Sequence, residues 1–271
     1  MEVLYGLHPV EEAVRSGARR LESVVLSRER GDVRLERLAQ LCRDAGVRVS
    51  MESRDQLTRL ARTDAHQGAL ALVRERAFLT IEDLLAPQPA KQAASDGAVS
   101  EHRFFLALDG IEDPHNLGAL IRTADGAGVD GVILPERRAA PVTATVAKTS
   151  AGASEHVRIA RVTNIVRALE QMKRANVWVL GLDERGTPDY TDFDFRTNCV
   201  LVLGREGAGL HDLVKKTCDH LLRIPMEGQV SSLNVSVAGA VVMYEALRQR
   251  RLPAQEIAKP VAKKPRKGLG S

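Results

Sequence analysis

The amino-acid sequence predicts an α/β protein with two domains, a small N-terminal domain and a larger C-terminal one. Its 271 residues suffice for two ordinary domains. Apolar segments of strand length alternate with segments of helical spacing in both halves of the chain. The C-terminal strands are short and apolar throughout, as expected for a parallel sheet that helices cover on both faces. We therefore expect a doubly wound α/β arrangement in that half.

The N-terminal half has the pattern of a small layered domain. A helix is expected around His8, because Pro9 stands near its start and Gly17 at its end. Apolar residues at helical spacing predict a second helix over 35–45, which Gly46 stops. Alternation of helices and strands favours a mainly parallel sheet. Strands are predicted at 21–27, 47–51 and 69–73, with a short helix between the last two.

Changes in composition along the chain predict the domain boundaries. Residues 86–98 carry two prolines and no apolar period, which predicts a flexible linker over residues 77–103. Five Lys or Arg residues stand among prolines and small residues after Ala258, so residues 253–271 are expected to form a disordered basic tail. The predicted domains are a small N-terminal domain at 1–76 and a larger C-terminal domain at 104–252.

From residue 104 onward, strands and helices alternate again. Periodicity alone gives a doubly wound α/β domain and no finer topology. Strands are predicted at 104–108, 131–134, 177–182, 199–203 and 221–224, and helices at 116–127, 163–175 and 234–250.

Composition also narrows the classes of function. A net charge of +4 and a pI of about 9.1 agree with nucleic-acid binding without requiring it. Aromatic residues make up only 3% of the chain, so recognition of phosphate and shape by Arg and Lys is expected rather than stacking of bases on rings. The three cysteines lie far apart, and no secretory signal or membrane-spanning segment is evident. We expect a cytoplasmic protein without a metal site or a membrane partner.

Three segments in the C-terminal half share an unusual character. In the first two, an apolar strand runs into a loop of glycines and charged groups. In the third, Ser231, Ser232 and Asn234 supply candidate N-cap side chains, and the first N–H groups of the following helix stay free to meet an electron-rich ligand. Core packing does not require three such segments, so we interpret them as parts of one site. The segments are 108–124, 201–210 and 228–237.

In order and in residue type, these segments resemble the three signature motifs of the SpoU branch of the SPOUT RNA methyltransferases. The resemblance covers about residues 104–250. Within the branch, Asp113-Pro-His-Asn-Leu-Gly and Ser231-Ser-Leu-Asn-Val-Ser-Val are most similar to bacterial 23S ribosomal RNA guanosine 2′-O-methyltransferases. The resemblance implies a trefoil knot in the C-terminal domain, S-adenosylmethionine as cofactor, a homodimer, and an N-terminal domain that binds ribosomal RNA. General topology rules would not propose the knot.

The resemblance also implies which residues form the site. The implied catalytic positions are Asn116, Arg122, Glu206, Ser232 and Asn234. The implied cofactor-binding positions are Leu203, Gly204, Gly207, Ile224, Met226, Ser232 and Leu233. Of these, Ile224 and Leu233 could sandwich an adenine.

Taken singly, the same residues have ordinary interpretations. Asn116 can cap the helix that follows it, and Arg122 lies off the apolar stripe of that helix, as a solvated arginine would. Gly204-Arg-Glu-Gly lacks the spacing of a phosphate-binding glycine loop and would fit a turn with a surface glutamate. The presence of all three segments in one chain favours the functional interpretation.

The implied reaction is attack of a ribose 2′-oxygen on the methyl group of the cofactor. Proteins hardly deprotonate a guanidinium, so we assign Arg122 to stabilisation of the developing alkoxide and assign proton removal to no residue. Two alternatives stay open: a transfer-RNA ribose methyltransferase of the same fold, and a non-catalytic RNA-binding factor for ribosome assembly. The intact polar positions argue against the second, because a protein without activity is free to lose them.

Overall fold

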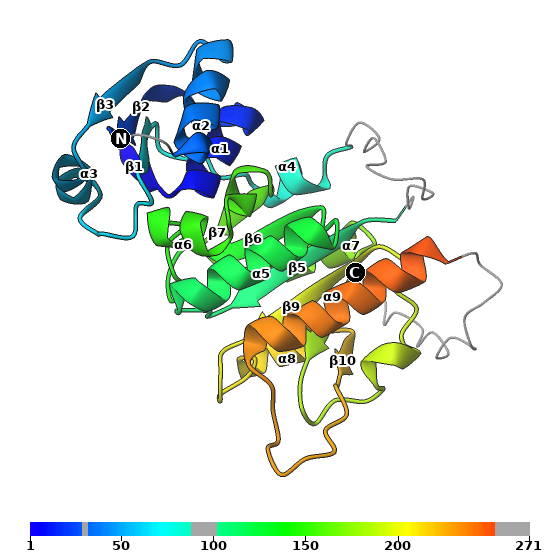
Figure 1. Ribbon diagram of the computed structural model, residues 1–271. Coiled ribbons are helices and arrows are strands. Elements are labelled where there is room, and N and C mark those ends of the chain that lie inside the picture. Colours follow the sequence, from blue (N-terminus) through cyan, green and yellow to red (C-terminus); the bar gives the residue numbers. More distant parts are fainter. Residues whose placement is uncertain (29–31, 88–101, 253–271) are drawn as a thin grey trace.

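The computed structural model describes residues 1–28, 32–87 and 102–252, which form two α/β domains (Figure 1). This confirms the fold class that the sequence predicts. The predicted basic tail and most of the proline-containing part of the predicted linker lie outside the described residues.

The N-terminal domain contains a four-stranded sheet in the order β1-β4-β2-β3. Helices α1 and α2 pack on one face around the larger core, and α3 packs on the other face. Strand β4 runs antiparallel to both β1 and β2, and only β2 and β3 are parallel. The elements are β1 (Glu2–Tyr5), α1 (Leu7–Ser16), β2 (Leu21–Ser27), α2 (Val33–Asp44), β3 (Val49–Glu52), α3 (Arg54–Ala61) and β4 (Ala69–Val73).

The expectation of a mainly parallel N-terminal sheet is therefore wrong. Strand β1 has four residues, of which only Leu4 is fully buried, and Gly6 alone separates it from α1. So short a strand leaves no alternating pattern long enough to predict. Strand β4 runs antiparallel to both β1 and β2, and these two pairings make the sheet mixed.

The C-terminal sheet has six strands in the order β10-β8-β9-β5-β6-β7, and every neighbouring pair is parallel. Five of the strands were predicted. The sixth, β7, was missed because Arg158 and Arg161 interrupt its apolar residues. The strands are β5 (Phe104–Asp109), β6 (Gly131–Pro135), β7 (Ile159–Val162), β8 (Trp178–Leu182), β9 (Cys199–Gly204) and β10 (His220–Leu222).

Helices cover both faces of this sheet, as the all-buried strands β5 and β9 require. Helices α5, α6 and α9 pack on one face, and α4, α7 and α8 pack on the other. The helices are α4 (Ile81–Leu85), α5 (Pro114–Gly126), α6 (Ala144–Thr149), α7 (Ile165–Arg174), α8 (Asp212–Thr217) and α9 (Val235–Arg251), with short 3-10 turns η1 (Ala153–Glu155) and η2 (Tyr190–Asp192).

The structure corrects the start of the predicted linker. Leu79 pairs with Ala160 next to the edge strand β7, and Ile81 and Leu84 of α4 are buried in the core of the C-terminal sheet. Thr80 begins α4 with a reciprocal capping box to Asp83. A segment with this many buried contacts belongs to the C-terminal domain.

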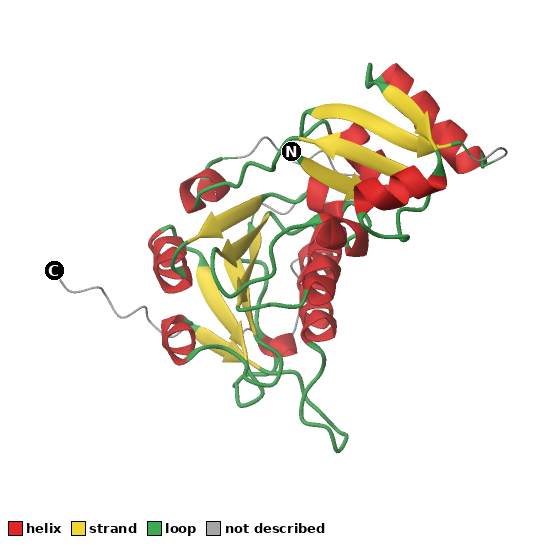
Figure 2. Cartoon of the chain, turned by 90° about the vertical axis from the view of Figure 1, so that its left-hand side faces the viewer, coloured by secondary structure: helices red, strands yellow, loops and turns green. Residues whose placement is uncertain are grey.

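The two domains pack against each other. Helix α1 and strand β1 contact α6 and η1, and Ala147 of α6 is buried within the N-terminal core. Figure 2 shows the N-terminal domain above the end of a helical layer of the C-terminal domain.

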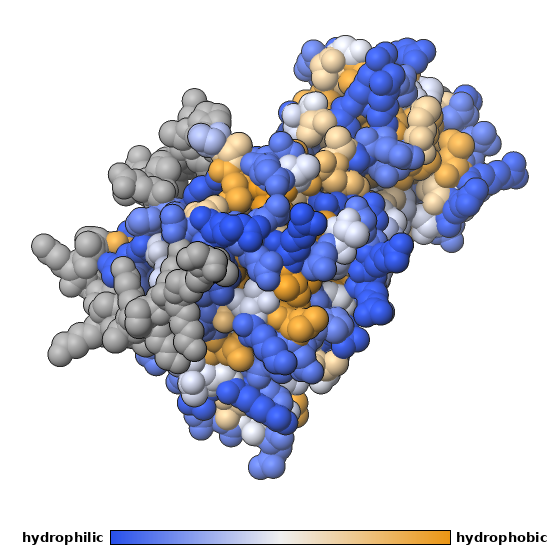
Figure 3. All heavy atoms as spheres, turned by 180° about the vertical axis from the view of Figure 1, so that it is seen from behind, coloured by the Kyte–Doolittle hydropathy of each residue, from blue (hydrophilic) through white to orange (hydrophobic). Residues whose placement is uncertain are grey.

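The surface is largely polar. On the face shown in Figure 3, apolar side chains form small separate groups among hydrophilic ones. In the part of the chain that the structure describes, no helix is long and apolar enough to cross a membrane.

Candidate active site

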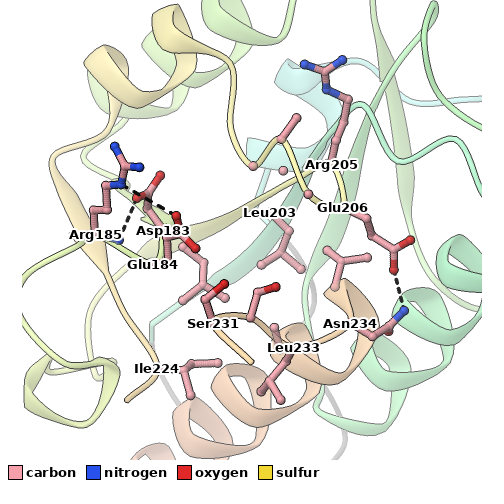
Figure 4. A pocket seen from close by; sticks show the side chains of 18 of the residues that line it. Asp183, Glu184, Arg185, Leu203, Arg205, Glu206, Ile224, Ser231, Leu233 and Asn234 are labelled. Carbon is pink, nitrogen blue, oxygen red and sulfur yellow. Dashed lines mark hydrogen bonds and ion pairs between the residues drawn. The ribbon is translucent and has the colours of Figure 1, made fainter. Parts of the chain in front are cut away.

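A cavity of about 700 Å³ lies at the carboxyl ends of β8 and β9. Its apolar side chains come from the ends of β8 and β9, from the loop after β9, from the segment between β10 and α9, and from the start of α9 (Figure 4). The positions that were predicted to bind the cofactor lie around this one cavity. They are Leu203, Gly204, Gly207, Ile224, Met226, Ser232 and Leu233.

Gly204 allows the loop after β9 to fold back over the strand end. A Cβ atom at this position would lie 2.2 Å from the carbonyl carbon of Gly209 and 2.3 Å from the backbone nitrogen of Leu210. The fold-back is fixed by a hydrogen bond of 3.0 Å from the backbone N–H of Arg205 to the carbonyl oxygen of Gly209. Position 204 therefore requires glycine, because any side chain would push the loop away from the cavity wall.

Three polar side chains from three separate segments meet at the rim of the cavity. The Nδ2 atoms of Asn116 and Asn234 donate to Oε1 of Glu206 at 3.0 and 2.5 Å. Asn234 Nδ2 also donates to Oδ1 of Asn116 at 3.0 Å. Figure 4 shows the bond between Glu206 and Asn234. The three candidate motifs therefore converge at one point, which we call the Asn–Glu–Asn cluster.

The helix caps differ in part from the prediction. Asp113 caps α5 by accepting from the backbone N–H of His115, so the side chain of Asn116 is free to reach Glu206. Asn234 does cap α9, accepting from the N–H groups of Ser236 and Val237. Capping was the wrong role for Asn116 because Pro114 already opens the helix two residues earlier.

Two predicted catalytic residues do not join this cluster. Ser232 lines the cavity, but no hydrogen bond of its side chain is present among the described residues. Arg122 lies six residues beyond Asn116 on α5, is exposed, and does not line the cavity. Within the described part of the chain its guanidinium has no hydrogen bond or ion pair. Arg122 is therefore free to bind a partner from outside.

Sequence reasoning missed a charged pair on the opposite wall of the cavity. Asp183, at the end of β8, lies 2.6 Å from the Lys215 Nζ of α8, and both residues line the cavity. Burial acts to raise the pKa of the Asp183 carboxyl, but hydrogen bonds from Lys215 and from the N–H of Arg185 bring that pKa below its ordinary value. The run Asp183-Glu-Arg after an apolar strand was a usable signal, whereas nothing local marks Lys215.

A second buried pair ties the loops at this end of the sheet together. Asp109, at the end of β5, is 4% exposed and accepts from the backbone N–H of His211 at 2.8 Å. The His211 ring nitrogen Nδ1 lies 2.9 Å from the same carboxylate. This pair links the end of β5 to the segment that follows the 205–209 loop.

The cysteines take no part in chemistry at this site. Burial raises the pKa of the Cys199 and Cys218 thiols to about 12 and that of Cys42 to about 11. These thiols stay protonated at neutral pH and are poor nucleophiles. Among the residues described, no group of three or more His, Cys, Asp or Glu side chains could hold a metal ion.

The Asn–Glu–Asn cluster gives a first testable prediction. Asn234→Asp keeps an oxygen that can cap α9 but replaces the amide donor by a carboxylate beside Glu206. We expect methyl transfer to fall about 10- to 100-fold, since a hydrogen bond to a charged group contributes roughly 1.5–3 kcal/mol. The measurement is the initial rate with saturating cofactor.

The matched control is Ser236→Ala, which removes a hydroxyl that bonds to Asn234 Oδ1 but leaves both amide donations intact. This variant should retain most of the activity. Equal losses in the two variants would show that any change at the start of α9 lowers activity, and would leave the amide donation to Glu206 without a specific role.

Comparison with known proteins decides the family. A sequence profile of the SpoU rRNA methylase family matches residues 103–244, and one for RNA 2′-O ribose methyltransferase substrate binding matches residues 3–79. The chain belongs to the SpoU family of RNA 2′-O-methyltransferases. The trefoil knot is inherent to this fold.

Similar curated proteins span nearly the whole chain. The chain is 40% identical to the 23S rRNA (guanosine-2′-O-)-methyltransferase RlmB of Vibrio cholerae over 252 residues, which cover 92% of this chain and 97% of the relative. It is 38% identical to the putative TrmH family tRNA/rRNA methyltransferase YacO of Bacillus subtilis, with 92% and 96% covered.

Solved SpoU structures share both domains. The SpoU methyltransferase AviRb of Streptomyces viridochromogenes, in complex with AdoMet, has a TM-score of 0.73 and 26% identity, and the match covers 92% of this chain and 90% of AviRb. The AdoMet-bound rRNA methyltransferase of Sinorhizobium meliloti has a TM-score of 0.71 and 26% identity, with 91% and 87% covered.

Proposed function

We propose that this protein transfers a methyl group from S-adenosylmethionine to the ribose 2′-oxygen of a guanosine in 23S ribosomal RNA, in the cytoplasm. Family membership supports RNA 2′-O-methylation, and the identity to proteins named RlmB supports the guanosine and the ribosomal RNA. The observation that carries the proposal is the Asn–Glu–Asn cluster, which joins three separate motifs at the rim of an apolar cavity.

The residues around the cavity fit S-adenosylmethionine. The volume of about 700 Å³ lies within the range of roughly 300–1,000 Å³ that is typical of small-molecule sites. Leu203, Ile224 and Leu233 provide apolar walls on which the faces of an adenine can pack (Figure 4). The folded-back 205–209 loop offers backbone groups, and Glu206 offers a carboxylate that suits a hydroxyl or an ammonium group. When bound, this cofactor supplies an electrophilic methyl group on a sulfonium.

The protein's own contribution is alignment and electrostatics. The Asn–Glu–Asn cluster fixes the ends of α5 and α9 and the loop after β9 relative to one another, which holds the reacting region in one geometry. Arg122, exposed and without an acidic partner among the described residues, is assigned to the RNA. Its guanidinium stabilises negative charge that develops on the ribose oxygen.

Mapping of ribose methylation tests the function directly. In cells that lack this protein, we expect one guanosine of 23S ribosomal RNA to lose its 2′-O-methyl group, and the wild-type gene should restore it. Loss of a methyl group from transfer RNA instead would establish the transfer-RNA alternative. An unchanged methylation map in both RNAs would contradict the proposed activity.

We also propose that the protein acts as a homodimer whose contact surface includes α9. Val237 and Tyr244 are 49% and 52% exposed and lie seven residues apart, on one face of this helix. Large apolar side chains repeated along one helix face are typical of a surface that a partner covers. A second copy of the chain is the partner that membership of the SpoU family favours.

Tyr244→Glu tests this surface. Burying a carboxylate against an apolar partner is costly, so we expect a shift from dimer to monomer at micromolar concentration. Sedimentation velocity measures the change. Leu213→Glu, at an exposed apolar position on α8 on the opposite face of the sheet, is the control and should leave the dimer intact. A wild-type protein that sediments as a monomer would contradict the proposed dimer.

We propose that the basic tail predicted at 253–271 adds RNA affinity through phosphate contacts, without sequence information; the alternative is an inert terminus. Truncation after Leu252 removes five Lys or Arg residues, so RNA binding should weaken uniformly and depend less on salt, with the methylated nucleotide unchanged. Binding measured at several salt concentrations gives the slope of affinity against salt. Identical slopes for the full-length and truncated proteins would exclude the tail from RNA binding.

A further inference from the structure

Two arginines of the N-terminal domain converge on one buried glutamate of the C-terminal domain. The Glu155 side chain in η1 is fully buried. Arg19 precedes β2, and its Nε lies 3.0 Å from Glu155 Oε2, an ion pair in which neither atom has a hydrogen-bond partner among the described residues. Arg76 Nη2, which follows β4, lies 3.2 Å from Glu155 Oε1 and also donates to the carbonyl oxygen of Ser154. We call Arg19, Glu155 and Arg76 the interdomain triad.

The triad makes the docked arrangement specific. Charges removed from water cost several kcal/mol each, and pairing offsets that cost only in a well-defined geometry. Any shift of the N-terminal domain that kept Glu155 buried would leave it without one arginine or both. Arg19 also pairs with Glu2, so that the second carboxylate balances the charge.

Tight packing surrounds the triad. A Cβ atom at Gly152 would lie 2.7 Å from the Glu12 side chain of α1, so the two domains approach too closely there for any other residue. Lys148 Nζ donates to the carbonyl oxygen of Ala65 at 2.8 Å and lies 5.7 Å from the centre of the Tyr5 ring. The two domains are therefore closely packed around the triad.

The same segment of the C-terminal domain abuts the helix that carries Asn116. A Cβ atom at Gly118 of α5 would lie 2.6 Å from Cβ of Thr149 and 3.1 Å from the backbone nitrogen of Ser150. Thr149 ends α6, and Ser150 continues toward η1 and Glu155. The N-terminal domain, the α6–η1 segment and α5 thus form one continuous packed path.

We propose that Glu155 is a positioning residue: it holds the substrate-binding domain in one orientation relative to α5, and thereby selects which ribose of a bound RNA reaches the methyl donor. The proposal rests on the proposed function. Methyl transfer needs reacting atoms about 3–3.5 Å apart, so an RNA that is gripped by one domain and modified by the other requires a fixed offset between the two.

Glu155→Gln tests the proposal in the full-length protein. The amide keeps the size of the side chain but leaves Arg76 without a carboxylate partner and leaves Arg19 with Glu2 alone. We expect an unchanged Kd for S-adenosylmethionine, a fall in kcat/KM for RNA of up to about 100-fold, and methyl groups spread over neighbouring nucleotides. Hydrogen exchange should show loss of amide protection in residues 147–155, where the domains meet.

The matched control is Glu12→Gln. It alters the hydrogen bond of 2.7 Å between Glu12 Oε2 and His156 Nε2 at the same interface, where the two side chains are 25% and 37% exposed. Exposed pairs contribute little, so activity, methylated position and amide protection should stay at wild-type values. If a change of any glutamate at this interface disturbed the structure, Glu155→Gln and Glu12→Gln would show the same losses.

A triple variant, Arg19→Met, Arg76→Met and Glu155→Met, keeps the proposal testable if Glu155→Gln does not fold. Apolar side chains of similar volume can replace a buried ion network without loss of folding. This variant should restore amide protection and methylation at the single wild-type nucleotide. The proposal would be overturned if the triple variant had wild-type amide protection but methylated several nucleotides. It would also be overturned if folded Glu155→Gln had wild-type kinetics and methylated the wild-type nucleotide. Failure of the wild-type protein itself to methylate RNA would instead overturn the proposed function.

Discussion

Replacement of Gly204 by alanine is expected to abolish cofactor binding and to destabilise the C-terminal domain. The new Cβ atom would fall 2.2–2.4 Å from backbone atoms of Gly209 and Leu210, where no side-chain rotation can relieve the clash. Overpacking of this kind costs about 1–3 kcal/mol, and more where backbone must move. The loop would have to leave the strand end and take Glu206 with it. Isothermal calorimetry with S-adenosylmethionine and thermal unfolding measure the two effects.

Gly228→Ala is the control for this variant. Gly228 precedes the cavity-lining serines, has no positive φ, and a Cβ atom there would meet nothing within 4 Å. Its cofactor affinity and unfolding temperature should match those of the wild type. If Gly204→Ala bound S-adenosylmethionine as tightly as Gly228→Ala, the fold-back of the loop would have no part in cofactor binding.

Arg122→Ala is expected to reduce kcat for RNA methylation by about 100- to 1,000-fold and to leave cofactor affinity unchanged. The loss follows from its assigned role, because removal of one donor that stabilises a developing oxyanion costs roughly 2.7–4 kcal/mol. Cofactor affinity should persist because Arg122 does not line the cavity. Single-turnover rates with saturating RNA, together with calorimetry, separate the two quantities.

Two further variants make this result specific. Arg122→Lys keeps the charge but not the planar fork of donors, and should recover only part of the rate. Arg174→Ala removes an exposed arginine from α7, on the other face of the sheet, and should behave as the wild type. A loss of S-adenosylmethionine affinity in folded Arg122→Ala would place this side chain at the cofactor instead of at the RNA.

The grouping of the candidate site residues was largely predictable from the sequence because they stand where strands end. Loops that follow parallel strands meet at one edge of the sheet, so the segments after β5 and β9 had to be neighbours. The side-chain pairing was not predictable. That Asn116 reaches Glu206 rather than capping its own helix depends on Asp113 taking the cap, which only the structure shows.

Local sequence patterns did not predict the domain interface. Arg19, Arg76 and Glu155 stand far apart in the chain, each among other charged or polar residues, and a charged residue is ordinarily interpreted as exposed. Their burial depends on two domains meeting, and periodicity within a single element carries no information about that contact. For the same reason the sequence predicts a linker around α4, although this segment packs on the C-terminal sheet.

The buried glutamate in η1 also bears on how far the two halves of such enzymes can be exchanged. A chimera that joins the N-terminal domain of a relative to this C-terminal domain would bury Glu155 against whatever side chains stand at the two arginine positions. Chimeras with arginine at both positions should fold as one unit. Chimeras without these arginines would bury a carboxylate at the domain interface without a positively charged partner. To direct this protein to a new RNA, the N-terminal domain would therefore have to be exchanged together with the residues that contact Glu155.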